Sequence, residues 1–217
     1  DKDDSQKIGK SSQILFLPAE FSVNAENKQV VSKPFSISVT AKNISGAVAP
    51  NYNGTVALYP LPVNPAATLG AAFTPPAISG EQFERGKAEA NISYNRYGII
   101  KIKGMDSIDN TKAGLTGDIQ FLPKGISVNA ELPSGRDFFY VEEPIGVLIK
   151  IVDEAGNAVV NYPGTVNLFS SAGFSIVPDY TFTLEDAGQK KIVAAATKAG
   201  TYTIKASVQE GALSGES

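Results

Sequence analysis

A short acidic stretch of the chain contains the residues best suited to bind a metal ion. Asp106, Asp109 and Asn110 lie within five positions of one another, and Asp118 follows. Ca²⁺ prefers carboxylate and carbonyl oxygens, and it stiffens some junctions between extracellular domains. Asp106, Asp109 and Asp118 therefore predict a calcium site at a domain junction. The spacing is not that of an EF-hand, and solvated turn carboxylates are the alternative interpretation.

Two adjacent pairs of acids, Glu142-Glu143 and Asp153-Glu154, have the residue types that hydrolyse glycosidic bonds. Neighbouring residues of a strand point to opposite faces, so neither pair can converge on one bond. The chain contains no His and no Cys, which excludes Ser-His and Cys-His nucleophiles and thiolate metal sites. These absences predict a protein that is not an enzyme and has no cofactor apart from the possible calcium.

Aromatic residues suggest two possible binding surfaces for polysaccharide. In residues 137–141 (DFFYV), a strand would put Phe138 and Tyr140 on one face and Phe139 on the other. Tyr52 and Tyr162 each begin a Tyr-x-Gly-Thr-Val motif, whose tyrosine could stack on a sugar. For both features the structural interpretation is favoured: the first as core and edge packing, the second as the repeated start of a strand.

The chain contains an internal repeat. FLPAEFSVNAE (16–26) matches FLPKGISVNAE (121–131) at a distance of 105 residues, and NYNGTVALYP (51–60) matches NYPGTVNLFS (161–170) at 110 residues. YGIIKIKG (97–104) aligns with AGTYTIKA (199–206), and AGLTGD (113–118) resembles GALSGE (211–216). The ordered matches predict two copies with a boundary near Gly117. The expected divisions are a polar arm (1–13), a first domain (14–117) and a second domain (118–217).

The elements that carry these residues are predicted to be strands throughout. Residues 35–41 (FSISVTA), 88–94 (AEANISY) and 202–208 (YTIKASV) alternate between apolar and polar side chains. Asp153 begins a turn in which Gly156 suits a positive φ. The Pro-rich residues 60–80 are expected to form a long loop. About seven short strands in each copy predict an all-β protein of two tandem antiparallel β-sandwiches.

Three segments of the second copy carry a resemblance to a known family: DEAGNAVVNYPGTVNL (153–168), DYTFTLEDAG (179–188) and AGTYTIKA (199–206). These motifs resemble the bacterial immunoglobulin-like repeats of surface proteins, with filamin-like features. The resemblance covers most of the second copy, whereas the first copy departs from it at ISGAVAP and at ERG. It implies immunoglobulin-like sandwiches that serve as stalks, adhesin segments, surface-layer pieces or filament subunits.

Composition and charge narrow the partners. The formal net charge is -3 with 19% charged residues, so no basic stripe for nucleic acid is expected, and no apolar run is long enough to span a membrane. We expect an exported, extracellular or cell-surface structural protein that contacts further repeats or copies of itself. A polysaccharide- or receptor-binding module is the alternative. The polar arm (1–13) could add a strand to the sheet edge of a neighbour, and its deletion would then abolish assembly.

Overall fold

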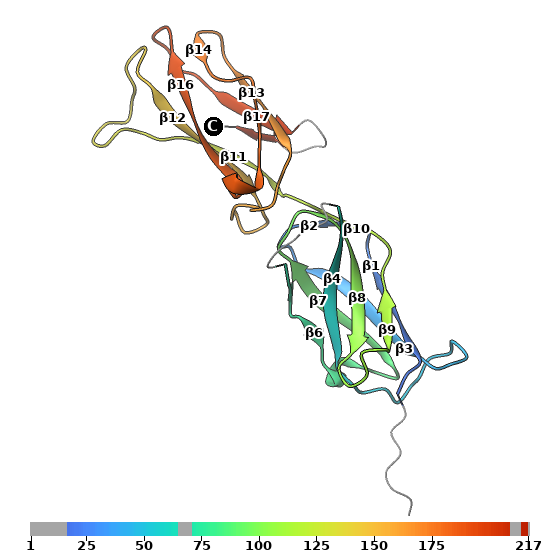
Figure 1. Cartoon of the computed structure of the whole chain (residues 1–217). Helices are drawn as coiled ribbons and strands as arrows, with labels where there is room; N and C mark the ends of the chain where they lie inside the picture. Colours follow the sequence, from blue (N-terminus) through green and yellow to red (C-terminus); the bar gives the residue numbers. More distant parts are fainter. Residues whose placement is uncertain (1–16, 65–70, 209–213, 217) are drawn as a thin grey trace, which may run out of the picture.

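The computed structural model describes residues 17–64, 71–208 and 214–216, which form two β-sandwiches lying end to end (Figure 1). Every pairing between described strands is antiparallel except the one between β2 (Lys28–Val30) and β10 (Ile119–Leu122). The predicted all-β fold of antiparallel sandwiches is confirmed. In this part of the chain there is no helix with the length and apolarity needed to cross a membrane. The polar arm (1–13) lies outside the described residues.

The described residues of the first sandwich form two sheets and a 3-10 turn, η2 (Gly80–Gln82). Strand β9 (Ala113–Leu115) pairs with β8 (Gly98–Asp106), next to the part of β8 that pairs with β10. One sheet has the order β1 (Glu20–Ala25), β3 (Phe35–Lys42), β7 (Lys87–Tyr94), β5 (Phe73–Thr74). The other has the order β2 (Lys28–Val30), β10 (Ile119–Leu122), β8 (Gly98–Asp106), β4 (Val56–Asn64), β6 (Ala77–Ile78), with β9 (Ala113–Leu115) beside β8.

The second sandwich repeats this arrangement, but none of its described strands takes the place of β10 or of β2. Its strand β18 (Ser214–Glu216) pairs with β17 (Ile204–Val208) as β9 pairs with β8. One sheet has the order β11 (Gly125–Ala130), β12 (Ile145–Val152), β16 (Gln189–Ala196), β14 (Phe174–Ser175). The other has the order β15 (Asp179–Thr181), β13 (Thr165–Ser170), β17 (Ile204–Val208), β18 (Ser214–Glu216), and a 3-10 turn, η3 (Leu184–Asp186), precedes β16.

The cores follow the alternation of the sequence. In β3, Phe35, Ile37, Val39 and Ala41 are all buried between the sheets. The predicted turn at Asp153 is confirmed, since its carboxylate accepts hydrogen bonds from two backbone N–H groups and Gly156 has a φ of 81°. Stability therefore comes from apolar residues on one face of each strand.

The Pro-rich passage 60–80 differs from the expected loop. Strand β4 continues through Pro60 and Pro62 to Asn64, and β5 and β6 follow within the same passage. Both prolines lie beyond the part of β4 that pairs with β6. A residue without an N–H group is tolerated at such an edge, because no hydrogen bond to a neighbouring strand is lost there.

Strand pairing also changes the predicted boundary near Gly117. Strand β10 begins two residues after Gly117, yet it pairs with β8 and β2 of the first sandwich. Phe121 of β10 is fully buried there. If the chain is divided by its sheets, the boundary lies between Leu122 and Gly125, because β11 is the first strand of the second sandwich.

Candidate functional site

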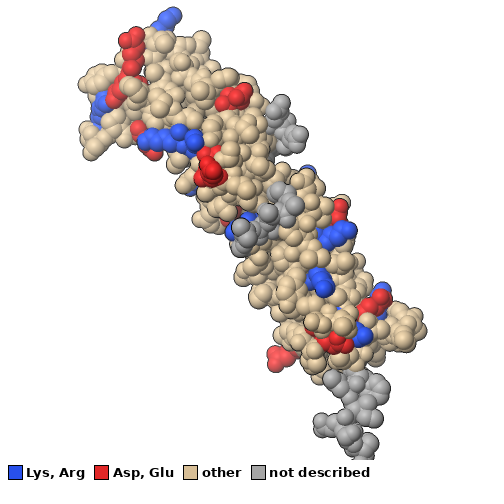
Figure 2. Space-filling view, viewed as in Figure 1, with Lys and Arg blue, Asp and Glu red and all other residues tan. Residues whose placement is uncertain are grey.

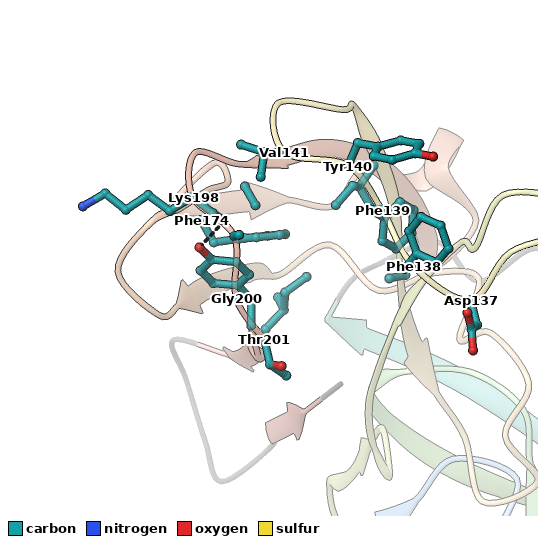
Figure 3. A pocket seen from close by; sticks show the side chains of 15 residues that line it. Asp137, Phe138, Phe139, Tyr140, Val141, Phe174, Lys198, Gly200 and Thr201 are labelled. Carbon is teal, nitrogen blue, oxygen red and sulfur yellow. Dashed lines mark hydrogen bonds between the residues drawn. The ribbon is translucent and has the colours of Figure 1, made fainter.

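A cavity of about 470 Å³ opens in the second sandwich and is a candidate binding site (Figure 3). Two segments, 137–141 and 198–202, form most of its wall, and Phe174, Ala196 and Ile204 contribute from the strands. Both segments lie beside Ile145, where β12 begins, whereas Glu154, whose N–H donates to Val31 of the first sandwich, lies just beyond the other end of this strand. The cavity is therefore at the outer end of the molecule.

Exposed aromatic rings form one wall of the cavity. The rings of Phe138 and Tyr140 meet edge to face with centroids 5.5 Å apart, and they are 50% and 65% exposed. The guanidinium carbon of Arg136 lies 4.8 Å from the Tyr140 centroid and 5.7 Å from that of Phe138. Both distances are within the range of cation–π attraction. This wall is therefore an apolar aromatic surface that the Arg136 guanidinium stabilises.

Glu143 contacts two residues that form or support the aromatic wall, and it stabilises their positions. Its carboxylate accepts a hydrogen bond of 2.8 Å from the backbone N–H of Tyr140 and pairs with the guanidinium of Arg136. The Tyr140 hydrogen bond and Arg136 hold the pKa of Glu143 below its usual range. Glu143 is thus committed to a positioning role.

The opposite wall carries a second aromatic pair. The rings of Phe174 and Tyr202 lie 5.4 Å apart, and the Tyr202 hydroxyl donates a hydrogen bond of 2.7 Å to the carbonyl of Lys198. This bond closes the turn 198–202, which forms the rim of the cavity (Figure 3). Asp137 is the one acid among the described residues of the lining. Chemistry by a pair of acids therefore has no support in this cavity, whereas apolar and aromatic binding does.

In residues 137–141 the predicted division of the rings between two faces is found, although the sequence favours core and edge packing as the interpretation of this segment. Phe138 and Tyr140 are exposed, whereas Phe139 packs against the core. The segment is not a strand, however, and the opposite wall was not predicted. The available signal was Tyr202, which stands in the second copy where the first copy has Ile100.

The predicted acid pairs are held apart by other partners. Glu142 has a φ of 67° and lies in a turn with Glu143, so the strand geometry expected for this pair is wrong. Asp153 is buried in its turn, whereas Glu154 forms an ion pair of 3.3 Å with Lys124. In neither pair do the two carboxylates act together.

The three residues predicted to bind calcium are not brought together. Asp106 is buried and accepts hydrogen bonds from the Tyr52 hydroxyl at 2.7 Å and from the backbone of residues 108 and 109. Asp109 accepts from Thr111. The Asp118 carboxylate lies 3.8 Å from the Lys101 ammonium. Lys101 and Asp106 are five residues apart on β8, which separates their backbones by roughly 17 Å. The described residues contain no group of three acids able to hold a metal, and calcium stays a prediction.

The two Tyr-x-Gly motifs are packing devices. A Cβ placed on Gly54 or on Gly164 would lie 2.7 Å or 2.3 Å from the hydroxyl oxygen of the tyrosine two residues earlier. Each ring therefore lies directly over its glycine, and only glycine leaves it room. Tyr162 is buried against Phe182 and Tyr97. This supports the structural interpretation of the repeated phrase.

A side chain that the sequence did not single out joins the two sandwiches. The amide of Asn161 accepts a hydrogen bond of 2.9 Å from the backbone N–H of Tyr97 and donates one of 2.8 Å to its carbonyl. Asn161 is buried, the backbone N–H of Glu154 donates to the Val31 carbonyl at 3.1 Å, and the Tyr97 and Tyr162 rings lie 5.1 Å apart. The repeated motif NYNG/NYPG, which begins with Asn51 and with Asn161, was the sequence signal that could have pointed to this asparagine. We call this set of contacts the joint.

Surface charge does not mark a further site. Figure 2 shows Lys, Arg, Asp and Glu scattered in small groups over the described part of this face, with large uncharged areas between them. The charges of the whole chain nearly balance, with 19 Lys and Arg against 22 Asp and Glu. A phosphate backbone selects a continuous basic surface, so this face does not favour nucleic acid.

Comparisons with known proteins do not assign a family. No family model matches the chain, and no curated protein matches it. Among solved structures it is similar to invasin, a bacterial integrin-binding protein (14% identity, TM-score 0.44), covering 90% of this chain and 38% of that one. It is also similar to the D0-D1 domain of intimin (14%, 0.34; 91% and 94% covered) and to a Bacteroides vulgatus β-glycosidase (11%, 0.34; 91% and 24%). The chain spans about a quarter of the length of that glycosidase. With TM-scores under 0.5, these similarities carry no argument about function.

Proposed function

We propose that this chain is a non-catalytic structural segment of an exported cell-surface or extracellular protein, in which two sandwiches act as a stiff spacer. The joint carries this proposal. Two residues, Pro123 and Lys124, separate β10 of the first sandwich from β11 of the second. Asn161 then binds both backbone groups of Tyr97, which restricts bending and twisting about this short connection. A spacer needs such a joint, whereas a hinge between catalytic domains does not.

The stiffness is tested by Asn161→Ala, with Asn51→Ala as the matched control. Asn51 has the same place in the first copy but is exposed and far from the joint. In dilute solution, small-angle X-ray scattering should show a single extended shape for the parent chain and for Asn51→Ala, and a broader distribution of shapes for Asn161→Ala. An unchanged distribution in Asn161→Ala would mean that the joint does not set the stiffness.

Export is tested on the cells that make the protein. An antibody raised against the 217-residue chain should label intact cells, and external protease should remove the label. Labelling that appears only after the cells are permeabilised would contradict a surface role. Repeating the labelling and the protease treatment with and without EDTA tests whether calcium affects either result.

Polysaccharide binding is a second candidate function, and the cavity favours it. Paired aromatic rings on two walls, with Lys198 and Asp137 at the rim, are suited to stack on and hydrogen-bond a sugar. A glycan array probed with the parent chain and with Tyr140→Ala tests it. Binding that is lost in this variant supports the candidate, and an array without signal contradicts it.

A further inference from the structure

We propose that the cavity of the second sandwich accepts residues 14–17 of a second copy of this chain as an added β-strand, so that copies assemble head to tail. This inference rests on the proposed structural function and deepens it by naming the partner. It is carried by the difference between the two sandwiches. The first sandwich contains the strand that the second lacks among its described residues.

In the first sandwich, β10 fills the place that corresponds to the cavity. Its residue Phe121 is fully buried, with its ring centroid 5.5 Å from that of Phe35 and 4.7 Å from that of Tyr94. The backbone of β10 pairs antiparallel with β8, where Phe121 stands opposite Gly98, and parallel with β2. One short strand thus closes the gap between β2 and β8.

Hydrogen bonding identifies the corresponding residues in the second sandwich. Ser32 and Glu142 both have positive φ, and their N–H groups donate at 2.8 Å to the carbonyls of Tyr94 and Ala196 respectively. Strand pairing likewise matches Phe35 with Ile145, and the repeat matches Gly98 with Gly200. The counterparts of the Phe121 neighbours, Ile145, Ala196 and Gly200, all line the cavity.

Exposed apolar residues mark the same place. Val31 follows β2, bonds to Leu122 of β10 and is 1% exposed. Its counterpart Val141 is 44% exposed, and Phe138 and Tyr140, which stand where β2 runs, are 50% and 65% exposed. An added strand between the segment 138–141 and the start of β17 would cover these side chains as β10 covers Val31.

The sequence of the chain supplies the matching strand. Residues 13–18 read QILFLP, and residues 118–123, which contain β10, read DIQFLP. Each is followed by a related strand, β1 or β11. Strand β10 thus comes just before the second sandwich and completes the first. By the same relation, residues 14–17 come just before the first sandwich and complete a second sandwich, with Phe16 in the place of Phe121.

The strand cannot reach the cavity of its own chain. Strand β1 begins at Glu20, opposite Lys42, at the end of the first sandwich away from the joint. The four residues from Glu20 back to Phe16 span at most about 14 Å. The nine residues of β8 alone extend about 30 Å between this end and the joint, and the second sandwich lies beyond it. Residues 14–17 that enter this cavity therefore come from a second copy.

The joint provides a second set of matching surfaces. Asn51 corresponds to Asn161 and is exposed, and Ala199 corresponds to Tyr97. Ile44 corresponds to Glu154, whose N–H bonds to Val31, and it is 97% exposed. In a head-to-tail pair that copies the joint, Asn51 binds the backbone of Ala199 and Ile44 covers Val141. Such a contact joins two different surfaces and does not close, so it produces a filament.

Disulfide trapping tests the register, because the native chain contains no cysteine. Gln120 stands opposite Ile99, so the proposal puts Leu15 of one copy opposite Thr201 of the next. Opposed strand residues have the Cα separation that a disulfide requires. The variant with both Leu15→Cys and Thr201→Cys should form a ladder of covalent oligomers on oxidation. A mixture of the two single variants, Leu15→Cys and Thr201→Cys, should also give heterodimers that are crosslinked between positions 15 and 201. The control pair Leu15→Cys and Val193→Cys, whose second site is exposed on β16, should form no ladder.

Phe16→Asp tests the strand without cysteines. Because the proposal places Phe16 in the sandwich of another copy and not in a sandwich of its own chain, circular dichroism of the dilute variant should be unchanged, while sedimentation and electron microscopy should show the loss of concentration-dependent filaments. Deletion of residues 1–13, which leaves the strand intact, should preserve them, whereas the sequence-based hypothesis that the polar arm itself adds the strand predicts their loss. Filaments that persist in Phe16→Asp, equal ladders in both cysteine pairs, or a parent chain that stays monomeric would overturn the proposal. A monomer that is still extended and surface-exposed would leave the proposed function standing, and glycan binding at Tyr140 would then assign the cavity to polysaccharide.

Discussion

Replacing Phe121 with alanine will unfold the first sandwich at a much lower urea concentration than the parent chain requires. The ring is fully buried between Phe35 and Tyr94, and truncation of a buried Phe to Ala costs about 3–5 kcal/mol in unfolding free energy. With an m-value of about 2 kcal/mol per molar urea, the midpoint falls by about 2 M. Backbone amide NMR signals assigned to each sandwich report the two transitions separately.

The second sandwich serves as the internal reference for this prediction, because Phe121 precedes β11 and lies in the other core. Its midpoint should change by less than the equivalent of about 1 kcal/mol, apart from coupling through the joint. Phe16→Ala, studied as a dilute monomer, is the matched control and should change neither midpoint. A loss below about 1 kcal/mol in the first sandwich, or an equal loss in both, would refute the assignment of β10 to the first core.

Three further predictions concern the motifs. Gly164→Ala places a Cβ against the buried Tyr162 ring, so thermal unfolding should show a loss of about 1–3 kcal/mol that Gly117→Ala, in open space, does not produce. Burial and the Asp106 hydrogen bond raise the pKa of Tyr52 far above its usual range. The contribution of Tyr52 to stability is therefore complete below pH about 10 and lost as the pH rises further, and Tyr52→Phe should flatten this alkaline loss in urea titrations. EDTA tests the calcium prediction: a fall of several degrees in the melting temperature that added Ca²⁺ reverses would support it, and an unchanged melting temperature would contradict it.

The β-structure was predictable because alternation reports burial directly. In β3 and β7 every second side chain enters the core, and the pattern depends only on the period of a strand. The cavity was not predictable in the same way. It depends on two segments 60 residues apart, 137–141 and 198–202, whose approach is decided by the sheet order. Glu143 and Arg136 then hold the first segment in a turn, although its composition is typical of a strand.

The predicted domain boundary shows a more general limit. A repeat in a sequence determines the length of the repeating unit, but the unit can be divided at any point without changing the repeat. The predicted boundary near Gly117 lies between matched phrases of the repeat. The last strand of the first sandwich, however, ends at Leu122, and the first strand of the second sandwich begins at Gly125. The distinction depends on Phe121, whose ring enters the core that precedes it in the chain. This difference of a few residues in the boundary decides whether β10 is assigned to the first or to the second sandwich. Under the head-to-tail proposal, residues 14–17 therefore correspond to the last strand of a preceding sandwich and not to the first strand of their own.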